Sequence, residues 1–142
     1  MFNPNLKKLS LILGTLTILY AQTLMAKDFN GAWHLRVMDG MEVRKARAIL
    51  ELDMDKMKLS GFDACNRIGG TLIKNSDTTM TTPMLRSTKM GCRSKIHNWV
   101  SKRLHALLKE GFNIKEEKKY GIHGITLKSP SHELFFKRMQ KD

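Results

Sequence analysis

The chain has 142 residues and carries a formal net charge of +12, from 25 basic and 13 acidic side chains. This length is enough for one domain and too short for two comfortable ones. There are only two cysteines and three prolines, and no internal repeat or low-complexity segment, which excludes a repeat array.

The first 26 residues have the order of a cleavable signal peptide. Lys7 and Lys8 form a positive start, a mostly apolar stretch runs over residues 9–20, and small Ala26 precedes polar residues. The alternative is an uncleaved membrane anchor, but about 12 apolar residues fall short of the roughly 20 that span a bilayer. No cysteine near the cleavage point could carry a lipid. We predict a signal peptide over residues 1–26 and a domain over 27–142 with no transmembrane segment, in the periplasm or secreted.

The predicted mature domain is strongly basic. Removing Lys7 and Lys8 with the leader lowers the charge from +12 to +10. In a cytosolic protein, an excess of basic residues of this size indicates nucleic-acid binding. In an exported protein the expected partner is an anionic lipid or polysaccharide surface, and we predict no nucleic-acid partner. The alternative is that the charge only keeps a small monomeric domain in solution.

Two stretches of the predicted domain alternate between apolar and polar side chains, as antiparallel strands do. Residues 53–56 then indicate a hairpin turn into Met57, Leu59 and Gly61, and residues 129–131 a second turn. The predicted inward-facing set is Ala46, Ala48, Leu50 and Leu52, and the later set is Ile125, Leu127, Leu134 and Phe136.

One segment has helical spacing instead, and we predict a single amphipathic helix over about residues 94–110, with Ser94 as N-cap and Gly111 after its end. A basic face could bind a membrane surface, although a solvated face is the alternative. The predicted apolar stripe is Ile96, Trp99, Val100, Leu104, Leu107 and Leu108. The predicted polar face includes Lys95, Lys102, Lys109 and His105.

The two cysteines lie in short patches, residues 61–70 and 87–92. When an exported domain has only two cysteines, they usually form a disulfide with each other, so we favour a Cys65–Cys92 bond. The alternative is a nucleophilic thiol with a histidine partner, which no neighbour in the sequence supplies.

No other catalytic or metal-binding pattern is present. The five histidines lack the spacing of zinc ligands, and methionine pairs such as Met38 with Met41 fit a core better than a copper site. We therefore predict no enzyme activity, metal or cofactor.

The cysteine patches resemble those of the META domain family, which includes the heat-shock lipoprotein HslJ. Ala64 stands where the family usually has glycine, and the lipid-bearing cysteine of HslJ-type members is absent. The matching residues are Cys65-Asn66-Arg67 with Gly70, Thr88-Lys89-Met90-Gly91-Cys92, an opening Gly31, Trp33 and Leu35, and a closing Leu134 and Phe136.

The resemblance implies a mainly β fold of α+β class: a small, curved, barrel-like antiparallel sheet of lipocalin-like proportions with one helix. It also implies a cell-envelope protein associated with stress and antibiotic tolerance, without catalytic residues. The expected function is binding of an envelope protein or an anionic envelope component. The alternative is a small barrel that carries an apolar ligand, or a protein inhibitor. The expected binding surface is Asn66, Arg67, Thr88, Lys89 and Met90.

Overall fold

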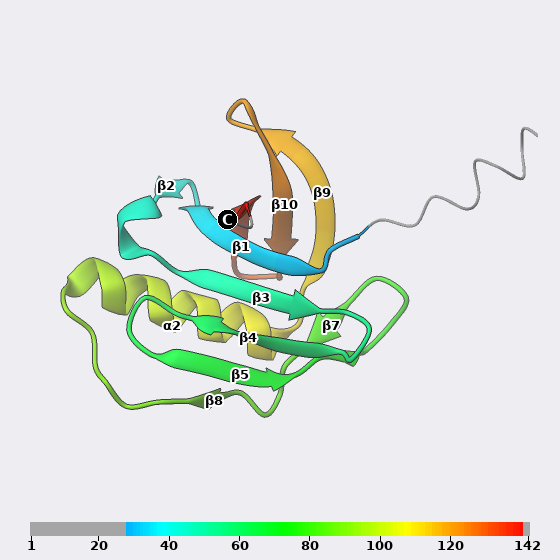
Figure 1. The fold of residues 1–142 in the computed structure, drawn as a ribbon, viewed down its shortest axis with the longest axis horizontal. Coiled ribbons are helices and arrows are strands. Elements are labelled where there is room, and N and C mark those ends of the chain that lie inside the picture. The colour runs from blue at the N-terminus through cyan, green and yellow to red at the C-terminus, as the bar shows by residue number, and fades with distance from the viewer. Residues whose placement is uncertain (1–27, 141–142) are drawn as a thin grey trace, which may run out of the picture.

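The computed structural model describes residues 28–140, so the predicted signal peptide lies outside the described residues. Residues 28–140 form one large antiparallel sheet, one short hairpin and one long helix (Figure 1). The prediction of a mainly β fold with a single long helix is confirmed. The elements are β1 (Gly31–Met38), β2 (Met41–Glu42), η1 (Arg44–Ala46), β3 (Ile49–Asp53), β4 (Lys58–Phe62), β5 (Arg67–Thr71), β6 (Ile73–Lys74), β7 (Met80–Thr81), β8 (Arg86–Ser87), α2 (Lys95–Glu110), β9 (Asn113–Lys119), β10 (Ile122–Lys128) and β11 (Glu133–Arg138).

The large sheet is curved and open. Its strand order is β8-β5-β4-β3-β1-β11-β10-β9, and β2 pairs with β1 beside this path. The first and last long strands, β1 and β11, pair with each other in the middle, with one meander on each side. Strands β8 and β9 do not pair with each other, so the barrel-like sheet is not closed.

Helix α2 covers one face of this sheet (Figure 1). Leu104 and Leu107 of the helix are fully buried in the same cluster as Leu35, Leu50 and Phe136 of the strands. These side chains fill the space between helix and sheet. The predicted apolar stripe is confirmed from Val100 onward, but Ile96 in the first helical turn is exposed and Trp99 is only half-buried.

The residues predicted to face inward before the first hairpin, Ala46, Ala48, Leu50 and Leu52, are all buried. The predicted strand is shorter, because Ala46 ends the 3-10 helix η1 and Arg47 has a positive φ of 58°, so β3 begins at Ile49. The hairpin turn is one residue longer than predicted. Met57 has a positive φ of 51° and lies in the turn, so β4 begins at Lys58. Asp53 stabilises this turn because its Oδ1 accepts a hydrogen bond from the Lys56 amide at 3.0 Å.

The helix ends are close to the prediction. Gly111 follows the last helical residue, and its amide donates to Leu107 O. Ser94 occupies the N-cap position, but its hydroxyl lies 2.7 Å from His97 Nδ1 and makes no capping bond to the backbone. The Ser94 carbonyl accepts a hydrogen bond from the Asn98 amide, which is the first i, i+4 hydrogen bond of the helix.

Strand β10 passes so close to β11 that only glycine fits at position 124. A Cβ there would lie 2.0 Å from Phe136 O and 2.9 Å from Phe135 Cζ.

Gly124→Ala should therefore lower the free energy of unfolding by about 3 kcal/mol or more, measured by urea unfolding. Gly69→Ala is the matched control, because its Cβ would meet only Leu59 O at 3.7 Å. Equal urea midpoints for the two variants would contradict this packing.

Candidate functional site

The two cysteine patches are joined by a Cys65–Cys92 disulfide, which confirms the predicted bridge. Cys65 is buried and Cys92 is exposed. Because both cysteines of the chain are in this bond, neither is a free thiol, and the alternative of a cysteine nucleophile is wrong.

The residues beside the cysteines hold the two patches together. Asn66 Oδ1 accepts hydrogen bonds from the amides of Met90 at 2.5 Å and Gly91 at 3.3 Å. Thr88 Oγ1 accepts from the Arg67 amide at 3.1 Å, and the Thr88 amide donates back to Arg67 O. The Asn66 side chain is thus used within the protein, which leaves the exposed Arg67, Thr88, Lys89 and Met90 as the outward part of the predicted binding surface.

Asp63, two residues before Cys65, is the most buried charged group of the described chain, with no exposed side-chain surface. Its Oδ1 accepts from the amides of Cys65 at 2.8 Å and Asn66 at 2.6 Å. Its Oδ2 accepts from Ser101 Oγ at 2.9 Å and lies 2.6 Å from His105 Nε2. One carboxylate therefore ties the cysteine loop to helix α2.

Burial raises the pKa of Asp63, but the hydrogen bonds from His105, the Asn66 and Cys65 amides and Ser101 outweigh it and hold the pKa below its ordinary value. Asp63 is therefore ionised at neutral pH. The serine and the histidine both meet the carboxylate rather than each other, so these residues do not form the relay of a serine hydrolase.

Sequence reasoning assigned His105 to a solvated basic face of the helix, and this assignment is wrong. The His105 side chain is 25% exposed and bonded to Asp63. The available signal was the i, i+4 spacing of Ser101 and His105 at the edge of the apolar stripe. The lysines of the basic helix face, Lys95, Lys102 and Lys109, are exposed to solvent. No carboxylate of residues 28–140 forms an ion pair with them.

A second carboxylate holds the other side of the helix. Asp39, in the turn after β1, lies 2.7 Å from Arg103 Nη1 and 2.8 Å from His132 Nδ1. Its other oxygen accepts from the Glu133 amide. Arg103 also lies over the Trp99 ring, 4.2 Å from its centre. These contacts tie the turn after β1 to helix α2 and to the turn before β11.

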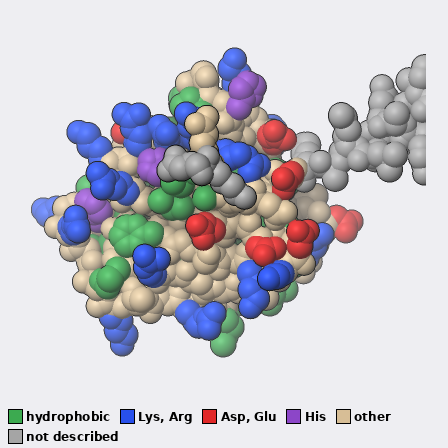
Figure 2. Space-filling view, viewed as in Figure 1, with side chains coloured by type: hydrophobic (Ala, Val, Ile, Leu, Met, Phe, Trp, Pro, Cys, Tyr) green, Lys and Arg blue, Asp and Glu red, His purple; other side chains and the backbone are tan. Residues whose placement is uncertain are grey.

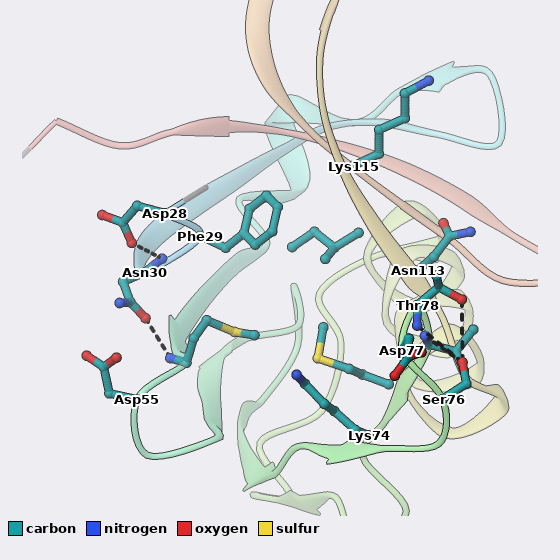
Figure 3. Close-up of a pocket in the computed structure, with 14 residues that line it drawn as sticks. Asp28, Phe29, Asn30, Asp55, Lys74, Ser76, Asp77, Thr78, Asn113 and Lys115 are labelled. Carbon is teal, nitrogen blue, oxygen red and sulfur yellow. Dashed lines mark hydrogen bonds between the residues drawn. The ribbon is translucent and has the colours of Figure 1, made fainter. Parts of the chain in front are cut away.

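An open site lies elsewhere, in a cleft of about 620 Å³ (Figure 3). It lies where the chain enters β1, beside the β3–β4 turn, the β6–β7 hairpin and the start of β9. The hairpin is held there by the paired backbones of Met80 and Phe112 and by the Thr82 amide, which donates to Leu108 O at 2.7 Å. The cleft is thus framed by segments far apart in the sequence.

The cleft has an apolar floor and a polar rim. Phe29, Met54 and Ile114 are half-buried against the core, and Met80 is buried beneath them. Figure 3 shows Asp28, Asn30 and Asp55 at one end, and Lys74, Ser76, Asp77, Thr78 and Asn113 at the other. Asn30 braces the first end because its Oδ1 accepts from the Met54 amide at 2.6 Å. The rim carries both charge signs, so the cleft suits a molecule with an apolar body and several polar groups.

A family model described as the META domain matches residues 23–141. The chain belongs to the META domain family. Two solved structures have the same fold. One is an NMR structure, 24% identical, with a TM-score of 0.61, covering 77% of this chain and 89% of that one. The other is an NMR structure of a protein from Burkholderia xenovorans, 21% identical, with a TM-score of 0.57, covering 79% and 83% of the two chains. No curated protein matches this chain.

The backbone at Ala64, where the sequence analysis expected glycine, adopts a left-handed conformation. Ala64 has a φ of 86°, a region that glycine adopts freely and alanine does not. The three hydrogen bonds on either side of it, which Asp63 makes with Cys65 and Asn66, hold the loop in this conformation. The turn at Ala64 thus lets Asp63 bond the backbone of the two residues that follow it.

Within residues 28–140, no helix is long and apolar enough to cross a bilayer. In the same range, no group of three His, Cys, Asp or Glu side chains is arranged to hold a metal ion.

Asp63→Asn should lower the free energy of unfolding at pH 7 by about 2 kcal/mol, because charge-assisted hydrogen bonds become neutral ones. Since the folded pKa of Asp63 is depressed, its contribution is present above the unfolded value of about 4 and is lost as pH falls through the folded pKa. Urea unfolding at pH 7, 5 and 3 should show the gap to the native protein shrinking at pH 3. A gap that stays constant, or one matched by the exposed control Asp55→Asn, would contradict this role.

Removing the disulfide should also destabilise the domain. The bond closes a loop of about 28 residues, for which the chain-entropy relation gives about 3.6 kcal/mol. The double variant Cys65→Ala/Cys92→Ser should unfold correspondingly earlier in urea, and dithiothreitol should shift only the native protein. A loss below about 1 kcal/mol would show that the Asn66 and Asp63 bonds hold the patches without the crosslink.

Proposed function

We propose that this META domain is an exported, non-enzymatic protein of the cell envelope. In this proposal it is HslJ-like and supports stress or antibiotic tolerance by binding a ligand or partner in the cleft of Figure 3. The observation that carries the proposal is the cleft itself. Its volume of about 620 Å³ is within the range of small-molecule sites, and it combines an apolar floor with polar groups along its rim.

The location part of the proposal is supported by the signal-like order of residues 1–26 and by the disulfide. A disulfide that joins both cysteines of the chain suits an oxidising compartment such as the periplasm. The absence of enzyme activity is supported by the engagement of Asp63, His105, Asp39 and His132 in contacts that hold the fold. The proposed partner is an envelope protein or an anionic envelope component.

The alternative of an apolar carrier receives less support from the fold. The sheet is open, and the space between it and α2 is filled by fully buried side chains such as Leu59, Leu104 and Ile125. An apolar ligand would therefore bind in the surface cleft and not in a barrel interior.

The cleft can be blocked without touching the core. Asn113 is exposed at the cleft on β9, and Lys118 is exposed on the same strand outside it. In a strain that lacks the gene, the native gene and Lys118→Trp should restore tolerance to heat, detergents and novobiocin-like drugs. Asn113→Trp should fail to restore it, at equal protein level and equal thermal stability.

Two outcomes count against the proposal. Unchanged sensitivity of the deletion strain would refute the role in tolerance. Full restoration by Asn113→Trp would refute the role of the cleft.

A further inference from the structure

We propose a second binding site, in a recess around Arg36, for a phosphate group carried by a molecule with an apolar part. The recess has a volume of about 420 Å³ and lies between the β1–β2 turn and the β9–β10 hairpin. It is separate from the cleft of Figure 3 and shares no residue with it. The inference rests on the proposed function only for the envelope location, and it adds a second, anionic ligand that binds in this recess and not in the cleft.

A β-bulge in the central strand places Arg36 in this recess. Leu35 pairs with Phe136 and Val37 with Phe135, so β1 has one residue more than β11 at this point. Leu35 and Met38 are both fully buried, although residues three apart in a regular strand face opposite sides. Arg36 and Val37 therefore both lie on the outer face. Bulges of this kind re-aim side chains and are frequent beside functional sites.

The Arg36 guanidinium has no partner among the described residues. Its Nε is shielded from solvent and makes no hydrogen bond. No carboxylate of residues 28–140 lies within ion-pair distance of the group. Shielding a charged donor without an acceptor costs free energy, and a bound oxyanion would remove that cost. A guanidinium offers parallel N–H donors that match two oxygens of a phosphate.

The surroundings of Arg36 are positively charged. Arg44 lines the recess, and Arg47 and His34 lie close by. Partial burial and the charges of Arg36, Arg44 and Arg47 hold the pKa of His34 below its ordinary value. The only acidic residue of the recess is Glu42, whose contact with Arg44 is 3.7 Å long and well exposed. Figure 2 shows several Lys and Arg side chains near the region where Figure 1 places β2.

The opposite wall of the recess is apolar and aromatic. Val37, Ile122 and the Tyr120 ring line it. Tyr120 is 64% exposed, and its ring packs edge-on against Phe135 at 5.8 Å, which fixes its position. A ligand bound through Arg36 would therefore rest its apolar part on Tyr120. This juxtaposition of cation and exposed aromatic favours an amphiphilic phosphate over a bare ion.

Phenyl phosphate is the direct probe for this site. Titrated into ¹⁵N-labelled native protein at 150 mM NaCl, it should shift the Arg36 Nε–H signal and the amides of Val37, Tyr120 and Ile122. Arg36→Gln should weaken binding about tenfold, the loss of one charge-assisted hydrogen bond. Arg44→Gln, at the exposed rim, should weaken phenyl phosphate binding several-fold. This variant replaces Arg36→Gln as the test if Arg36→Gln does not fold. Arg86→Gln, an exposed basic residue outside the recess, should change it less than twofold.

Vesicles identify the source of the phosphate. Cosedimentation with phosphatidylglycerol vesicles but not phosphatidylcholine vesicles, lost in Arg36→Gln and kept in Arg86→Gln, assigns it to a lipid headgroup. Binding of phenyl phosphate without vesicle binding assigns it to a soluble molecule. Binding of neither probe, or equal losses in Arg36→Gln and Arg86→Gln, overturns the site. Asn113→Trp should leave both assays unchanged, so failure of the cleft and failure of the recess are distinguishable.

Discussion

The fold depends on one buried carboxylate. Asp63 accepts four hydrogen bonds, two from the cysteine loop and two from side chains of helix α2. A fully buried charge is tolerated only when its oxygens are bonded in this way, and removing the partners leaves a large desolvation cost. The loop that contains Cys65 and the helix that follows Cys92 are therefore fixed relative to each other twice, once covalently and once through Asp63.

Two other carboxylates also connect helix α2 to the turns of the sheet. Asp39 holds Arg103 from the turn after β1, and Glu110 accepts from Ser129 and Ser131 in the turn between β10 and β11. The helix is thereby tied to both meanders of an open sheet. An open sheet needs such ties because it lacks the continuous strand pairing that closes a barrel. The two proposed binding sites, the cleft at β9 and the recess at the β1 bulge, lie on surfaces that these ties do not use.

The sequence was informative where neighbouring residues decide the structure. The alternation before Asp53, the turn after Lys128 and the helix up to Gly111 depend on spacing and on turn residues within a few positions. The presence of only two cysteines in a predicted exported domain indicated the disulfide. Local spacing could have placed Ser101 and His105 together at the edge of the apolar stripe, but it could not identify Asp63 as their partner, because that contact joins residues 42 positions apart. The bulge at Arg36 was also missed, since it arises from the register between β1 and β11 and not from β1 alone.

The most direct test of this account is native-state hydrogen exchange of the Cys65 and Asn66 amides in the oxidised protein. If Asp63 links loop and helix, these two amides should exchange only through the opening that also exposes the amides of Leu104 and Leu107. Their exchange free energies should then agree within about 1 kcal/mol. Rapid exchange of Cys65 and Asn66 while the helix amides remain protected would contradict the account.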